Sequence, residues 1–164
     1  MSKFIVLILI VLSLYKGYPY YNDYMSERAA DSARQTLQAE GVPQPDHKDF
    51  IDSIPYKEVV VDNGYPISTT TITFLGHTKE DFRSSALKDL FRIQEQEACH
   101  SANTYYENKQ LSDNSLKGYG RAFSEDKAAI RIILKDEDGA EVFSKTTTLA
   151  TDCITLRFTL KIVE

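Results

Sequence analysis

The stretch Tyr56-Lys-Glu-Val-Val-Val-Asp-Asn-Gly-Tyr-Pro-Ile-Ser-Thr-Thr-Thr-Ile-Thr-Phe-Leu75 contains the strongest local folding signal in this chain. β-Branched residues dominate both of its halves, 56–61 and 67–75. Asn63-Gly64 lies between them, and both residues tolerate the positive φ angles of a tight hairpin turn. The stretch therefore predicts two antiparallel strands joined by a short turn.

Three more strands are predicted toward the C-terminus. Residues 128–135 and 141–148 flank Asp136-Glu-Asp-Gly139 and form a second hairpin. This acidic turn lacks the ligand spacing of an EF-hand, so we interpret it as a turn and not as a calcium loop. In 154–162, apolar and polar residues alternate strictly, which is typical of a strand with one wet face.

Two helices complete the predicted fold. Residues 26–40 show a narrow apolar stripe and are followed by Gly41, a typical helix stop. A longer helix begins at Thr78 and is expected to end near His100. The fold class is α+β: an antiparallel sheet of about five strands with one long helix packed on it, preceded by an N-terminal membrane segment and a short helix.

The N-terminus carries an uncharged apolar run after Lys3. A basic start followed by such a run is typical of an export signal, and the run is shorter than the ~20 residues of an ordinary membrane-spanning helix. The predicted membrane segment consists of Phe4, Ile5, Val6, Leu7, Ile8, Leu9, Ile10, Val11, Leu12 and Leu14.

Two fates remain open for this segment. A cleaved signal peptide would release a secreted protein, but small residues do not occupy both positions that signal peptidase prefers. Tyrosines crowd the exit of the run and suit a membrane–water interface. We therefore favour an uncleaved anchor in the lipid bilayer, with the domain outside the cytoplasm, in the periplasm or extracellular space.

The predicted organisation has three parts: residues 1–17 as signal peptide or signal-anchor, 18–49 as a juxtamembrane helix and connector, and 50–164 as a single extracytoplasmic α+β domain. The chain of 164 residues carries a net charge of -5, and its acids and bases are interspersed. It therefore lacks the basic patch that nucleic-acid binding requires, and we expect no nucleic-acid partner.

Cys99 and Cys153 are predicted to form a disulfide, because an oxidising compartment favours pairing. Two buried free thiols, or a catalytic pair of Cys99 with His100, are the alternatives. No glycine elbow holds a serine nucleophile, no glycine loop suits a phosphate, and the three histidines are isolated in sequence. We expect no enzyme activity, no metal and no cofactor.

Two groups of residues are candidate interaction surfaces. Tyr105, Tyr106 and Tyr119 lie in the stretch 103–121, which is predicted to be a long loop with a short helix around 112–117. Thr69 and Thr71 would accept a partner strand if they lay at a sheet edge. Otherwise the tyrosines cover the end of the core, and the threonines form an ordinary polar sheet face.

These features predict a non-enzymatic envelope domain that acts by contacting another envelope protein. The alternative is a small extracytoplasmic hydrolase or ligand-binding domain that uses the 103–121 loop.

One run resembles a known group of proteins. Leu87-Lys-Asp-Leu-Phe-Arg92 with the following Cys99, and then Arg131-Ile-Ile-Leu-Lys-Asp-Glu-Asp-Gly139, form a helix–cysteine–strand–turn layout over about a third of the chain. This layout resembles small exported α/β proteins of Gram-negative bacteria, of the pilotin type or the quorum-regulated secreted virulence-factor type. The resemblance implies export, and it implies no particular functional residue.

Overall fold

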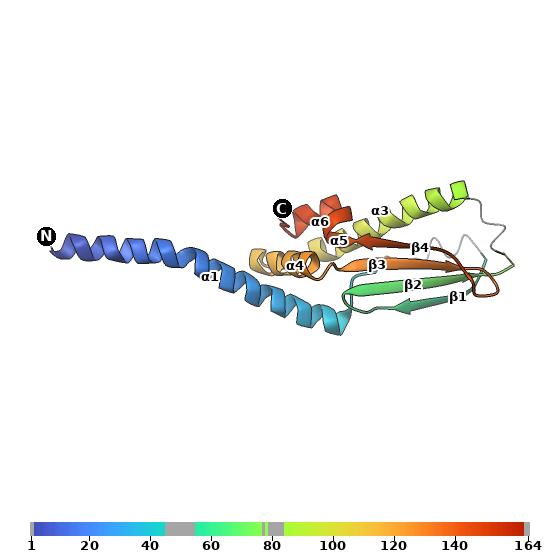
Figure 1. Ribbon diagram of the computed structural model, residues 1–164, viewed down its shortest axis with the longest axis horizontal. Helices are drawn as coiled ribbons and strands as arrows, with labels where there is room; N and C mark the ends of the chain where they lie inside the picture. Colours follow the sequence, from blue (N-terminus) through green and yellow to red (C-terminus); the bar gives the residue numbers. More distant parts are fainter. Residues whose placement is uncertain (1, 45–54, 77, 79–83, 163–164) are drawn as a thin grey trace.

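A computed structural model of the chain describes residues 2–44, 55–76, 78 and 84–162 (Figure 1). Side chains of residues 2–14, 84–88, 90, 91 and 94 lie outside this description. The α+β class is confirmed. The elements are α1 Ser2–Glu40, β1 Tyr56–Asp62, β2 Ile67–Phe74, α3 Ser84–Asn108, α4 Asp113–Glu125, β3 Ala129–Lys135, β4 Glu141–Thr148, α5 Leu149–Asp152 and α6 Ile154–Thr159.

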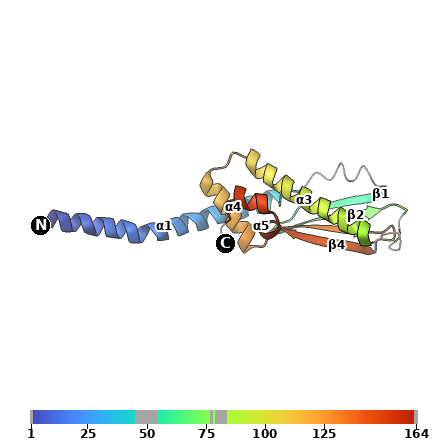
Figure 2. The same cartoon turned by 90° about the horizontal axis from the view of Figure 1, so that it is seen from above.

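The sheet has four strands in the order β1-β2-β3-β4, not the five that we predicted. Both predicted hairpins form, because β1 pairs antiparallel with β2 and β3 pairs antiparallel with β4. The central pair β2–β3 is parallel, so the expectation of a wholly antiparallel sheet was wrong. The connection through α3 and α4 is long enough for the crossover that a parallel pair requires. In Figure 2, α3 runs along the sheet.

The missing fifth strand is the segment 154–162, which begins with the helix α6. Leu156 and Leu160 are fully buried, whereas Ile154 and Phe158 are 67% and 80% exposed. Apolar residues that alternate with period two also include pairs that are four residues apart. Because residues four apart share a helix face, a helix places these apolar residues on two different faces. The strand prediction failed because the same apolar pattern fits both the two-residue period of a strand and the four-residue spacing of a helix.

The stretch 103–121 is not a loop. It continues α3 to Asn108 and, after a short turn, forms α4, which Ser112 caps by accepting a hydrogen bond from the Ser115 amide at 3.2 Å. Gly118 and Gly120 lie inside α4. A Cβ at Gly118 would come within 2.5 Å of the Ala29 carbonyl oxygen on α1. Glycine is used there for close helix packing, which sequence alone does not reveal.

The predicted short helix at 26–40 is the C-terminal part of α1, which runs unbroken from Ser2. It ends where predicted: Gly41 adopts a φ of +81° and its amide donates to the Leu37 carbonyl at 2.8 Å. The N-terminal half of α1 projects away from the body, and the C-terminal half packs on α4 (Figure 1). Within the part of the chain whose side chains are described, no helix is long and apolar enough to cross a membrane.

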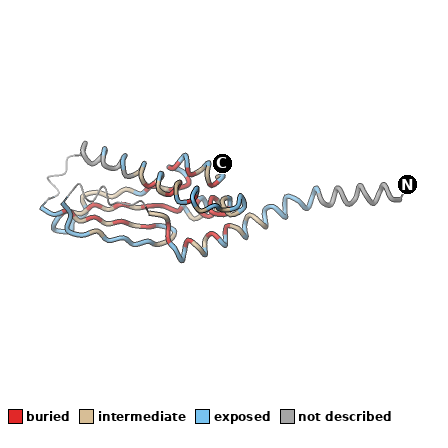
Figure 3. Tube along the Cα trace, turned by 180° about the vertical axis from the view of Figure 1, so that it is seen from behind, coloured by how far each residue is buried: buried red, intermediate tan, exposed pale blue. Residues whose placement is uncertain are grey.

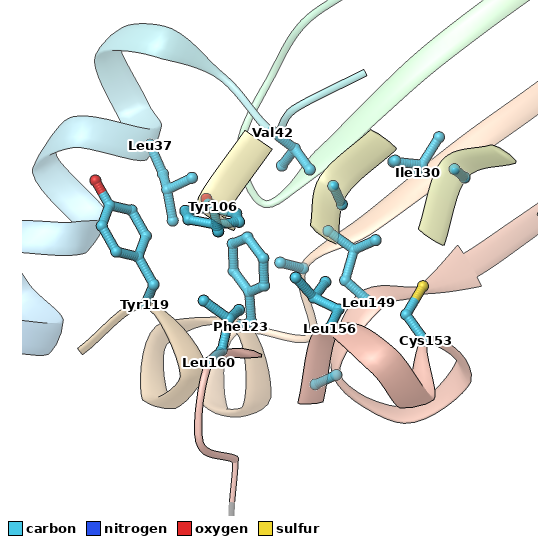
Figure 4. Packing of buried hydrophobic residues seen from close by; sticks show 14 of the residues in the cluster. Leu37, Val42, Tyr106, Tyr119, Phe123, Ile130, Leu149, Cys153, Leu156 and Leu160 are labelled. Carbon is cyan, nitrogen blue, oxygen red and sulfur yellow. The ribbon is translucent and has the colours of Figure 1, made fainter. Parts of the chain in front are cut away.

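One hydrophobic core unites both ends of the chain. Leu37 and Val42, from the predicted juxtamembrane segment, are buried with Tyr106, Phe123 and Leu160 (Figure 4). Figure 3 shows the burial concentrated where α1, α4 and the sheet meet, while the projecting half of α1 is exposed from residue 15 to residue 24. The predicted boundary at 49/50 lies outside the described residues.

Candidate functional site

The threonines proposed as a strand-accepting edge do not lie at an edge. Thr69 and Thr71 belong to β2, which has β1 on one side and β3 on the other. Both are half-buried and face away from the buried residues Ile72 and Phe74. Thr69 and Thr71 therefore fit the alternative interpretation, in which they belong to an ordinary polar face of the sheet. The edge strands are β1 and β4.

The three proposed contact tyrosines divide between core and surface. Tyr106 and Tyr119 are only 2% and 6% exposed, with ring centroids 4.9 Å apart, so they form part of the core. Tyr105, at 36% exposed, remains on the surface. The alternative function depended on a 103–121 loop that covers a pocket, and two packed helices stand in place of that loop.

Tyr105 belongs to a polar cluster at the C-terminal end of α1. Its hydroxyl donates to Glu40 Oε2 at 2.9 Å, and Lys109 Nζ donates to the same oxygen at 2.9 Å. The Lys109 hydrogen bond lowers the pKa of Glu40, which keeps this carboxylate charged. An open groove of about 790 Å³ lies beside the cluster and includes Asn63 and His100. The hydrogen bonds from Tyr105 and Lys109 to Glu40 hold the end of α1 against α3.

The disulfide lies on the other side of His100. Cys99 on α3 is bonded to Cys153, the residue between α5 and α6, with Cα atoms 5.1 Å apart, which confirms the predicted pairing. The prediction that this helix ends near His100 was wrong, because α3 continues to Asn108. The partner cysteine approaches the flank of α3. Because Cys153 directly precedes α6, the disulfide fixes that helix to α3.

A cavity of about 550 Å³ lies next to the disulfide, between α3 and the two C-terminal helices. Charged and polar groups rim it, including Arg92, His100 and Asp152, and Ile154 lines its edge. Glu95 at the same rim forms an ion pair with Lys145 on β4. The cavity is thus lined by both polar and apolar groups, and Ile154 of α6 belongs to its lining.

Ile154 and Phe158 form an apolar surface that the sequence analysis missed, and we call these two side chains the α6 ridge. Residues four apart are neighbours on a helix face. The disulfide at Cys153 and the buried Leu156 and Leu160 hold the ridge in place. Large, rigid apolar side chains of this kind are common anchors of protein interfaces. The i, i+4 spacing of Ile154 and Phe158 is visible in the sequence, but it indicates a shared surface only if the segment is a helix.

Among the described residues, no three His, Cys, Asp or Glu side chains come close enough together to hold a metal ion.

Comparisons of the chain with protein-family models, with curated proteins and with solved structures find no match.

Proposed function

We propose that this protein is a membrane-tethered domain, located outside the cytoplasm, that acts by binding another protein of the cell envelope. The observation that carries the proposal is the continuity of α1, which runs without interruption from the apolar segment into the core. The disulfide supports an oxidising compartment. A helix joined in this way would hold the domain at a fixed short distance from the membrane.

The tyrosines on the projecting part of α1 support a bilayer as its surroundings. Side chains at positions 15, 18, 20, 21 and 24 are all more than half exposed. At about 100° per residue they spread around well over half of the helix circumference. A partner helix would need a single stripe, whereas a membrane interface surrounds the helix and favours tyrosine.

The α6 ridge is the surface we assign to the protein partner. Phe158 and Ile154 are its anchors, and polar residues of the cavity beside Ile154, such as Arg92 and Asp152, would form part of the rim in a complex. Interfaces commonly combine an apolar centre with a polar rim.

The tether is tested by fractionation and intact mass. We expect the full-length mass in the membrane fraction, resistant to alkaline extraction. Replacing Leu9 by Arg should release the protein, because a charge within an apolar segment disfavours insertion. A shortened mass in the soluble fraction would support the cleaved leader and refute the anchor.

The binding surface is tested by placing a photo-crosslinking residue at position 158 in cells. We expect a discrete adduct that Ile154→Ser weakens. Ile67, which is 48% exposed on β2, is the control position and should give no such adduct. Equal adducts at positions 158 and 67 would contradict the assignment of the α6 ridge.

A further inference from the structure

The cavity of about 550 Å³ beside the disulfide contains a hydrogen-bond donor that the fold leaves unused. Asn103 of α3 lines this cavity and is only 6% exposed. Its Oδ1 accepts a hydrogen bond from the Thr159 hydroxyl at 2.6 Å, where α6 packs on α3 (Figure 1). Among the residues that the structure describes, none accepts a hydrogen bond from its Nδ2.

The Nδ2 atom of Asn103 is open to the cavity. Within the described part of the chain, the Tyr106 hydroxyl is the fully enclosed side-chain polar atom that lacks a partner, and Asn103 Nδ2 is not enclosed in this way. Native proteins satisfy most of their buried polar groups, because an unused donor costs stability. An oxygen atom that enters the cavity can therefore reach this donor and satisfy it.

The charges around the cavity balance, which indicates an uncharged ligand. Arg92 and Asp152 carry opposite charges, and Glu95 forms an ion pair with Lys145 of β4. Both carboxylate oxygens of Asp152 already accept hydrogen bonds from the turn at α5, at 2.7 and 2.9 Å. A ligand that presents an uncharged carbonyl oxygen meets an open donor, whereas a charged ligand meets no surplus of the opposite charge.

A peptide main chain in an extended conformation matches these properties. Its carbonyls are uncharged acceptors, and they are free because only a helix or sheet would occupy them internally. The disulfide and Ile154 supply an apolar wall for small side chains. The volume lies within the ~300–1,000 Å³ that is usual for ligand sites. Because Ile154 also belongs to the α6 ridge, a segment bound in the cavity continues onto that ridge.

We propose that this cavity binds an uncharged, extended segment of the partner protein, and that Asn103 Nδ2 donates a hydrogen bond to one of its main-chain carbonyls. The α6 ridge contacts the residues of the partner that flank this segment. The inference rests on the proposed protein-binding role of the α6 ridge, and it adds the chemistry of the segment that the partner contributes.

The test is a titration of the isotope-labelled full-length protein with acetyl-trialanine amide, a blocked peptide without charge, followed by NMR. We expect the side-chain amide signals of Asn103 to shift as peptide is added. Gln96→Trp should abolish this shift, because Gln96 is exposed on α3 and lines the cavity, so that the larger ring fills it.

A change at Asn103 itself tests the donor. Asn103→Asp replaces the amide by a carboxylate and should weaken peptide binding about tenfold, as expected when a hydrogen bond is lost from a buried site. Backbone amide signals of the cavity lining report the affinity of this variant. Asn108→Asp is the matched control, because Asn108 is exposed on α3 and lies outside this cavity, and it should leave the affinity unchanged.

Absence of a shift at Asn103, or peptide binding that neither Gln96→Trp nor Asn103→Asp weakens, would overturn the proposal. If Asn103→Asp does not fold, Gln96→Trp decides alone. Binding of a neutral oligosaccharide in place of the peptide would overturn the assignment to a protein segment. The titration requires no partner and no membrane, so its failure is distinct from failure of the α6 ridge, which the crosslink at position 158 reports.

Discussion

Arg34 on α1 donates hydrogen bonds from Nε and Nη2 to the two carboxylate oxygens of Asp126, at 2.8 and 3.3 Å. The same Nη2 donates to Glu125 at 2.5 Å, and the Tyr65 hydroxyl donates to Asp126 from the turn between β1 and β2. Three parts of the chain that are distant in sequence therefore meet around the Arg34–Asp126 ion pair. This network fixes the projecting helix to the folded body.

Asp126→Asn should weaken this junction and flatten the acid limb of the stability profile. The Arg34 hydrogen bond lowers the pKa of Asp126. Stabilisation from a lowered carboxyl pKa is complete above the unfolded value and is lost as pH falls through the folded value. We expect the variant to lose about 1–3 kcal/mol at neutral pH and to show a smaller slope below about pH 4.

Denaturant unfolding of the protein over a pH series measures both effects. Asp138→Asn, on the exposed β3–β4 turn, is the matched control and should leave the profile unchanged. A wild-type slope in the Asp126 variant would refute the role of this ion pair.

Gly118→Ala should separate α1 from α4. The added Cβ would lie 2.5 and 2.6 Å from backbone atoms of Ala29, which cannot move aside as a side chain can. We expect a loss of about 1–3 kcal/mol, typical of overpacking, seen as a lower melting temperature. Gly17→Ala is the control, because nothing lies within 4 Å of its added Cβ. If alanine at position 118 were as harmless as at position 17, the close approach would be wrong.

Reduction of the disulfide should destabilise the fold and release α6. Cys99 and Cys153 are 54 residues apart, and closing such a loop stabilises by about 4 kcal/mol in the chain-entropy model. We expect reductant to lower the denaturant midpoint of the wild type. The double variant Cys99→Ala, Cys153→Ala should have a low denaturant midpoint without reductant, and reductant should not change that midpoint. A wild-type midpoint unaffected by complete reduction would contradict this prediction.

The two hairpins and the Gly41 stop were predictable because their signals are local. Asp136–Gly139 forms a turn in which Gly139 has a φ of +85°. Asn63 and Gly64 lie between β1 and β2 as predicted, but neither has the positive φ of the predicted tight turn. The disulfide followed from the number of cysteines and the expected compartment.

The parallel β2–β3 pair and the helical glycines were not predictable, because they depend on contacts between distant segments. Gly118 resembles a turn residue until Ala29 is placed beside it. The buried stripe of α3 includes Ala98 and continues past Cys99 to Ala102, and both alanines are buried but too small to give a strong hydrophobic signal. The α6 ridge was not predicted, because the alternating sequence of this segment indicated a strand and not a helix.

Alanine substitutions at Leu156 and Phe158 test that period directly. In a strand both side chains would point to the core and both substitutions would be costly. In α6, Leu156 is fully buried and Phe158 is 80% exposed. We therefore expect Leu156→Ala to lose about 2–5 kcal/mol and Phe158→Ala to stay within about 0.5 kcal/mol of wild type. Denaturant unfolding of the two variants compares them, and similar large losses at both positions would restore the strand and remove the ridge as a binding surface.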